Sequence, residues 1–205
     1  SLDWFTKGYE VSSDLTIRER AEDVQLEMLR KNVDAAKQLA AKKPDDEHVK
    51  EGVVAVVKEL LNQEIEFWTR RTERYPQNMR LKQELAERLM RVRQYPLATK
   101  LLQQASADVR IEGPVLLALG KCFLAQKQNA LAMRQFEKAV QRFSAADTPT
   151  QFLECHYLLG RLQEEAKELE SAESHYLEVI GTDYDYKDAR DRLEKIQASR
   201  GNAGL

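Results

Sequence analysis

The feature that most restricts the fold of this chain is a set of small and bulky apolar residues that recurs at regular spacing. Gly120 is followed 12 residues later by Ala132, and then by Phe136 and Ala139. Residues of the same kinds stand 34 residues earlier and 40 residues later, at Ala86, Ala98, Leu102 and Ala105, and at Gly160, Ala172, Tyr176 and Val179. Small residues let helices approach closely and large ones fill the remaining space. The spacing therefore predicts a row of similar units that bury their apolar faces against one another.

The sequence is also poor in the residues that make tight turns. Its 205 residues include 8 Gly and 5 Pro, too few for the many turns of a β-sandwich or barrel. Thr148 is expected to cap a helix that begins at Pro149, with Gln151 in the capping-box position. We predict an all-α fold with helices near 15–43, 46–74, 78–92, 96–106, 113–126, 129–143, 149–166, 169–181 and 186–198.

The recurring pattern resembles the tetratricopeptide repeat (TPR), a helix–turn–helix unit of about 34 residues. The resemblance implies an α-solenoid with three repeats at 79–112, 113–146 and 147–186, the last lengthened by a longer connection. Residues 187–205 would then form a capping helix with a frayed tail. A generic helical bundle, in which the small residues fall at these places by chance, is the alternative.

The N-terminal part departs from this pattern. Residues 15–78 contain one break, around Pro44, and the segment Glu59 to Asn62 lacks turn-forming residues. We therefore expect a long helical hairpin or expanded repeat, with two helices of roughly 28 residues, or ~42 Å each. Residues 1–14 are similar to the end of a preceding repeat, which suggests that the chain is a fragment of a longer protein.

No pattern of catalytic or metal-binding residues emerges. The pair Gly120-Lys121 lacks the preceding glycine and following Ser or Thr of a phosphate-binding loop. The neighbours Cys155 and His156 lack the spacing of a zinc site, and no nucleophile motif is present. We expect no enzyme activity, no cofactor and no metal. No apolar run is long enough to span a bilayer, and two isolated Cys slightly favour a reducing compartment such as the cytoplasm.

The resemblance points instead to a protein-interaction scaffold. In this family, the first helix of each repeat lines a concave surface that binds a peptide or partner helix. Carried onto this sequence, the positions that we expect to contact a partner are Met90, Leu117, Lys121, Leu124, Tyr157 and Arg161. Lys121 and Arg161 occupy the same position of consecutive repeats and are expected to hold a carboxylate. The lysine and asparagine set that binds chaperone tails in this family is absent.

Two other functions remain open from the sequence. The first is self-association through the ends of the array or the hairpin, with a homodimer through the truncated N-terminal end. The second is nucleic-acid binding through residues 79–145, which contain 12 Lys and Arg against 5 Asp and Glu. Few aromatic residues accompany these charges, which disfavours stacking on single strands, and the net charge of the whole chain is −2. The sequence does not identify the partner.

Overall fold

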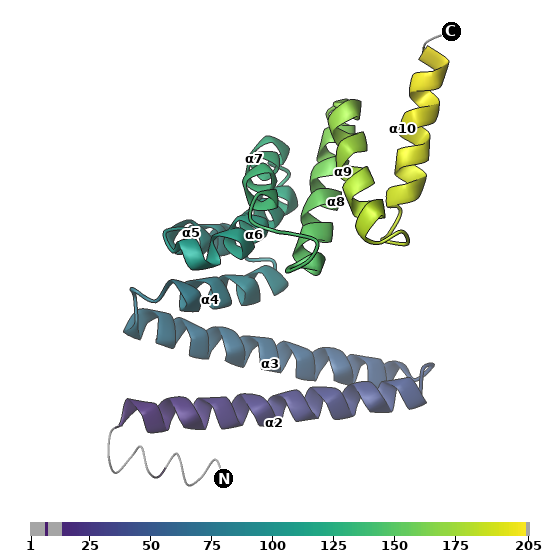
Figure 1. The fold of residues 1–205 in the computed structure, drawn as a ribbon. Helices are drawn as coiled ribbons and strands as arrows, with labels where there is room; N and C mark the ends of the chain where they lie inside the picture. Colours follow the sequence, from purple (N-terminus) through teal and green to yellow (C-terminus); the bar gives the residue numbers. More distant parts are fainter. Residues whose placement is uncertain (1–6, 8–13, 204–205) are drawn as a thin grey trace. The chain divides into compact units, whose positions relative to one another are not determined.

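The structure is a computed structural model that describes Lys7 and residues 14–203, with the backbone alone for 201–203. The described residues form helices and contain no strand. In chain order (Figure 1), the elements are α2 (Leu15–Lys42), α3 (Glu47–Arg74), α4 (Met79–Arg91), α5 (Tyr95–Ala105), the short 3₁₀ helix η1 (Val109–Ile111), α6 (Glu112–Ala125), α7 (Asn129–Val140), α8 (Pro149–Glu165), α9 (Leu169–Thr182) and α10 (Ala189–Ala203). The expected repeat remnant at 1–14 lies outside the described residues, apart from Lys7 and Asp14.

The chain divides into two compact units, Ser1–Pro76 and Gln77–Leu205. In the first unit, α2 packs against α3 (Figure 1), and each helix has 28 residues. Side chains of Asp14 and Asp46 accept hydrogen bonds from backbone N–H groups at the helix starts, as capping residues do. The helix α3 continues through Glu59 and Asn62 without a turn, because the segment has no Gly or Pro and Asn62 is its one turn-favouring residue.

The interface between α2 and α3 combines apolar and ionic contacts. Leu26, Val33 and Phe67 are buried. Beside them, the Arg71 guanidinium donates to Glu22 Oε2 at 3.1 Å, and both residues are buried. A buried guanidinium is tolerated where carboxylates and carbonyls satisfy its donors.

The second unit contains three helix pairs, α4 with α5, α6 with α7 and α8 with α9, each helix packed on the next along the chain. The recurring small residues lie where the two helices of a pair meet. A Cβ atom added at Gly120 would lie 2.3 Å from Phe136 Cε1, and one at Gly160 would lie 3.1 Å from Tyr176 Cε1. Ala132 and Phe136 have no exposed surface. Close packing between helices therefore explains the pattern on which the fold prediction was based.

A left-handed residue joins the two helices in each of these pairs. Arg93, Lys127 and Lys167 have φ angles of 61°, 58° and 66°. In each case the next N–H bonds to a carbonyl five residues back, as from Gln128 to Phe123 at 2.9 Å. This arrangement is the Schellman motif, in which glycine is usual because other residues are strained at positive φ. The three residues recur at intervals of 34 and 40, like the small residues.

The connection before α8 differs from the prediction. Thr148 precedes the helix but makes no side-chain capping bond. Its hydroxyl instead accepts from the Ser144 N–H at 3.0 Å and lies 3.2 Å from the Ser144 carbonyl oxygen. Thr148 therefore bonds back to Ser144 within the longer connection between α7 and α8 and does not cap α8. The capping-box pattern did not indicate this role.

The last helix, α10, covers the end of the second unit. Ala189, Leu193 and Ile196 are buried in one cluster with Tyr157 and Tyr176. The opposite side of α10 is exposed and charged.

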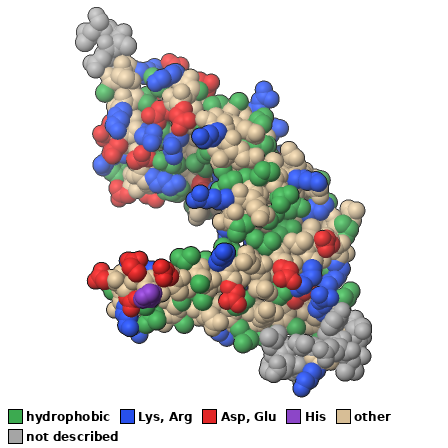
Figure 2. Space-filling view, turned by 180° about the vertical axis from the view of Figure 1, so that it is seen from behind, with side chains coloured by type: hydrophobic (Ala, Val, Ile, Leu, Met, Phe, Trp, Pro, Cys, Tyr) green, Lys and Arg blue, Asp and Glu red, His purple; other side chains and the backbone are tan. Residues whose placement is uncertain are grey.

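Over the face in Figure 2, basic and acidic side chains are interspersed among apolar ones. Within the described residues, no helix is long and apolar enough to cross a membrane.

Candidate functional site

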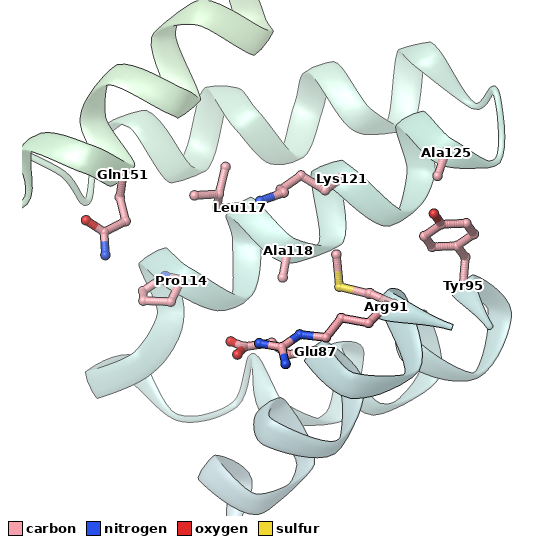
Figure 3. A pocket seen from close by; sticks show the side chains of 10 residues that line it. Glu87, Arg91, Tyr95, Pro114, Leu117, Ala118, Lys121, Ala125 and Gln151 are labelled. Carbon is pink, nitrogen blue, oxygen red and sulfur yellow. The ribbon is translucent and has the colours of Figure 1, made fainter. Parts of the chain in front are cut away.

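The second unit contains a pocket of about 500 Å³ between its first helices. Three residues come from α4, one from the start of α5, five from α6 and one from α8. Its lining (Figure 3) consists of Glu87, Met90, Arg91, Tyr95, Pro114, Leu117, Ala118, Lys121, Ala125 and Gln151. The volume suits a side chain or a short peptide segment.

Apolar groups from α4 and α6 form the floor of the pocket. Leu117 and Ala118 are 5% and 7% exposed, and Met90 is half-buried beside them in the lining. The helix α6 is apolar on nearly all sides because it packs against both α5 and α7, which leaves few polar groups on its pocket side. Pro114 and Ala125 lie at its two ends and are exposed. The accessible apolar surface of the pocket therefore comes from Met90, Pro114 and Ala125, above the buried Leu117 and Ala118.

Charged groups of both signs line the pocket around this floor. Lys121 Nζ lies 2.8 Å from Glu154 Oε1, a residue of α8 that is not part of the lining. The Glu87 carboxylate accepts a hydrogen bond from the Gln83 side-chain amide at 3.0 Å. In Figure 3, Glu87 and Lys121 lie on different sides of Ala118. The pocket thus combines an apolar centre with one acidic and two basic side chains.

The structure brings together three of the six residues expected from the sequence. Met90, Leu117 and Lys121 line the pocket. Leu124, which is half-buried, and Tyr157 and Arg161 of α8 do not.

Tyr157 requires a correction, because it is not an open surface residue. It is 6% exposed, its hydroxyl donates to Asp188 Oδ1 at 2.6 Å, and burial raises its pKa. Lys187 Nζ lies 4.4 Å from the centre of its ring. The segment that leads into α10 therefore covers the position at which Tyr157 was expected to meet a partner.

Arg161 also has a different environment from the one expected. Its guanidinium lies 6.0 Å from the centre of the Tyr157 ring, and Nη2 lies 3.8 Å from Glu165 Oε1. Lys121 is likewise paired, with Glu154. Each of the two cations expected to hold a partner carboxylate thus already faces a carboxylate of this chain.

The pocket also contains residues that the sequence analysis did not single out. Tyr95, Ala118 and Gln151 lie outside the positions that the resemblance supplies. Tyr95 begins α5, two residues after the left-handed Arg93, and Gln151 lies in the first turn of α8. The Gln-Tyr-Pro sequence after α4 marks a helix start, but nothing in it indicates that Tyr95 borders a pocket.

The histidines and cysteines form no metal site in the part of the chain that the structure describes. His156 of α8 and His175 of α9 face each other, with 2.9 Å between their Nδ1 atoms. Burial lowers the pKa of His156 to about 4 and lowers that of His175 as well. Cys155 donates to the Phe136 carbonyl at 3.4 Å, and burial raises its pKa to about 12. These groups therefore belong to the packing between helices.

Neither a protein-family model nor a curated protein sequence matches the chain. Solved structures do match it. YrrB, described as a TPR protein with an unusual peptide-binding site, has a TM-score of 0.62 and 16% identity, over 95% of this chain and 100% of its own. MamA has a TM-score of 0.62 and 14% identity, over 73% of this chain and 84% of its own.

A third match is the first TPR of Spaghetti (RPAP3), bound to the HSP90 peptide SRMEEVD. It has a TM-score of 0.53 and 15% identity, over 61% of this chain and 94% of its own. At identities this low, the matches carry information about the fold alone. The helix pairs of this chain, with glycine or alanine where the two helices meet, agree with that fold. The chain has the tetratricopeptide-repeat fold.

Proposed function

We propose that this chain is a non-enzymatic protein-interaction scaffold and that its second unit binds a peptide in the pocket formed by α4 and α6. The observation that carries the proposal is a pocket of about 500 Å³ with an apolar floor on a fold that serves this purpose in other proteins. YrrB is described as having a peptide-binding site, and the Spaghetti repeat domain was solved with a bound peptide. The proposed contact residues are the half-buried Met90, Tyr95, Lys121 and Gln151, with the buried Leu117 beneath them.

The proposal includes the division of the chain into repeats at 79–112, 113–146 and 147–186. Two independent features support it. The close contacts of Gly120 and Gly160 fall at equivalent places, and so do the left-handed residues of the Schellman motifs. Since a repeat array binds through equivalent positions of neighbouring units, a pocket between α4 and α6 is expected to span the first two of these repeats.

A selection experiment tests the pocket directly. The 205-residue chain is panned against a displayed library of random 12-residue peptides, and bound peptides are titrated by fluorescence anisotropy. In the variant Ala125→Trp, an indole would fill the pocket from an exposed helical position. The matched control is Ala130→Trp, an exposed alanine of α7 that is not part of the lining. We expect Ala125→Trp to weaken binding at least tenfold and Ala130→Trp to leave it within twofold.

Circular dichroism of both variants shows whether the fold is kept. Peptides that bind equally well to the native chain and to Ala125→Trp would place the binding surface elsewhere. A selection that enriches no peptide would reject the proposal for this unit.

A further inference from the structure

The second helices of the first two pairs expose the same kinds of residue. Leu97 of α5 and Leu131 of α7 occupy equivalent positions and are 55% and 41% exposed. The sides of these helices that contain Ala98 and Ala132 are buried. On the side of each leucine, three and seven residues later, lie four exposed polar or basic residues, Lys100, Gln104, Arg134 and Lys138. We call these four residues and the two leucines the basic surface.

The chain does not neutralise the cations of the basic surface. Among the described residues, the side chains of Lys100, Arg134 and Lys138 form no ion pair and no hydrogen bond. The next cation along the chain differs, because Arg142 Nε lies 2.8 Å from Glu112 Oε2. The three cations of the basic surface are thus available to a partner.

The acidic residue nearest to these cations in the sequence lies on another side of its helix. The helix α5 contains no Asp or Glu, and α7 contains Glu137 alone. Successive residues of an α-helix are rotated by about 100°, so Glu137 projects about 90° away from the strip of Leu131, Arg134 and Lys138. The basic surface therefore carries three positive charges and no negative one.

The third helix pair does not continue this surface. At the positions equivalent to Leu131, Arg134 and Lys138, α9 has Ser171, Ser174 and Glu178, and it contains no Lys or Arg. In the other direction the positive charge extends further. Arg93 and Lys127, in the turns before α5 and α7, are exposed and also form no side-chain ion pair among the described residues. The unpaired cations therefore gather on the first two pairs.

The spacing of the two helices suits an extended segment of a partner. Both α5 and α7 pack on α6, and packed helices lie about 8–10 Å apart. The axes of α5 and α7 are thus at most about 20 Å apart, a distance that about six extended residues span. One chain segment can lie across both strips.

The exposed leucines distinguish between two kinds of anionic partner. A phosphate backbone would leave Leu97 and Leu131 uncovered, and neither strip presents an aromatic ring on which a base could stack. Acidic residues with apolar ones between them match both features of the surface. The carboxylates pair with the cations, and the apolar side chains cover the leucines.

We propose that the basic surface binds an acidic, leucine-rich segment of a partner protein. Carboxylates of the segment pair with Lys100, Arg134 and Lys138, and its apolar side chains pack on Leu97 and Leu131. None of the six residues of this surface lines the pocket. The proposal is therefore a second interaction and does not rest on peptide binding in the pocket.

The test excludes the pocket by using Ala125→Trp, in which an indole fills it. This variant is panned against a displayed library of random 12-residue peptides, and enriched peptides are titrated by fluorescence anisotropy. We expect acidic peptides that contain Leu, Ile or Phe, and an affinity about fivefold lower at about 300 mM than at about 50 mM salt, because salt screens exposed charges. The same peptides should bind the native chain equally well.

Charge reversal then locates the binding surface. The triple change Lys100→Glu, Arg134→Glu and Lys138→Glu should weaken these peptides at least tenfold. The matched control reverses three exposed lysines of the first unit, with the changes Lys37→Glu, Lys42→Glu and Lys58→Glu. It alters the total charge equally and should keep the affinity within threefold. All six positions are exposed, and circular dichroism shows whether the helices are kept.

The leucines are tested separately. The double change Leu97→Ser with Leu131→Ser should weaken the acidic peptides at least fivefold. The control Leu177→Ser alters a leucine of α9 that is 52% exposed and should leave the affinity within twofold.

Four results would overturn the proposal. The first is a selection that enriches no acidic peptide, and the second is equal binding of the peptides to both triple variants. The third is a short DNA duplex that binds more tightly than the peptides and ignores the leucine changes, which would assign the surface to nucleic acid. The fourth is a molar mass that rises with concentration in sedimentation and no longer does so in Lys100→Glu, Arg134→Glu, Lys138→Glu, which would assign it to a second copy. None of these results affects peptide binding in the pocket, which is tested on the native chain.

Discussion

At the scale of single residues, the fold depends on positions where one carbon atom decides the packing. Gly120 and Gly52 show the contrast. A Cβ atom at Gly120 would lie 2.3 Å from Phe136 Cε1, whereas a Cβ atom at Gly52 would meet nothing within 4 Å. Both glycines lie within helices, so their backbone preferences are the same, and a difference between them reports the packing alone.

We expect Gly120→Ala to lower the free energy of unfolding by about 1–3 kcal/mol, because Phe136 must leave its place. The matched change Gly52→Ala should raise it by about 0.5–1 kcal/mol, because alanine is the better helix former. Thermal and urea denaturation measure both. A stable Gly120→Ala variant would mean that Phe136 can move without cost and that the small residue is not needed there.

The left-handed residues at the helix joints allow a test with the opposite sign. Lys127 has a φ of 58°, a conformation in which glycine is less strained than any other residue. We expect Lys127→Gly to stabilise the chain by about 0.5–1 kcal/mol. Lys138→Gly, at an exposed position inside α7, should destabilise it by about 1 kcal/mol. Equal effects of the two changes on the melting temperature would contradict the left-handed assignment.

At the scale of helix pairs, buried polar groups fix how neighbouring helices meet. In the second unit, one imidazole donates to the other between His156 and His175, whose Nδ1 atoms are 2.9 Å apart. In the first unit, Arg71 donates to Glu22, to Asp23 and to the Glu19 carbonyl. Such contacts are satisfied in one relative placement of the two helices, because leaving a buried polar group without its partner is costly.

The histidine pair predicts acid sensitivity. Burial holds the pKa of His156 at about 4, below its ordinary value of 6.5, and lowers that of His175. The unfolded chain therefore binds protons first, and the stability due to these groups is present above pH 6.5 and lost as the pH falls toward 4. We expect the melting temperature to drop between pH 7.5 and pH 5. The variant His156→Gln should show a smaller drop, whereas His48→Gln, which alters an exposed histidine, should behave like the native chain.

The ionic contacts of the hairpin predict a large effect of removing one partner. Arg71→Leu removes the 3.1 Å guanidinium contact to the buried Glu22 carboxylate, which keeps Arg70 at 3.2 Å, and we expect a loss of about 1–3 kcal/mol. The double change Arg71→Leu with Glu22→Leu should recover part of it, since no buried carboxylate then remains, although Arg70 loses its 3.2 Å partner. Chemical denaturation of the three variants gives the values. If the double variant is as unstable as Arg71→Leu alone, the loss of stability comes from altered packing and not from the unpaired Glu22 charge.

At the scale of the whole molecule, the last helix limits how much of the array is open to partners. The helix α10 buries Leu193 and Ile196 against α8 and α9. Arg192 links it to Glu164 of α8 at 2.8 Å and to Asp188 at 2.9 Å. The same segment covers Tyr157. An array of repeats exposes its apolar face at the end unless such a helix covers it.

Deleting residues 189–205 should therefore destabilise the second unit and expose apolar surface. We expect a lower melting temperature and increased binding of a fluorescent apolar dye. The control deletion of 201–205 removes no residue of the buried cluster and should change neither quantity. An unchanged dye signal in the longer deletion would show that the cluster around Tyr176 does not depend on α10.

The sequence by itself determined the helical repeat of this protein. The intervals between Gly120, Phe136 and their equivalents were sufficient, because contacts within one helix pair depend on local spacing. The unbroken helix α3 was predicted from the absence of turn residues between Glu59 and Asn62. Met90 and Leu117, chosen at equivalent positions of neighbouring repeats, line one pocket because these positions face the same way.

The tertiary structure alone decided which of these surfaces is open and how its charges are matched. Tyr157 fits the repeat pattern as well as the half-buried Met90 does, but Asp188 and Lys187, about 30 residues later, cover it. Lys121 was expected to bind a carboxylate of a partner, yet it forms an ion pair with Glu154 of α8. Contacts of this kind depend on where helices distant in the sequence come to lie, and no local pattern encodes that placement. Spacing within the chain thus specified the helix pairs, whereas packing between the pairs made the pocket and paired its Lys121 with Glu154.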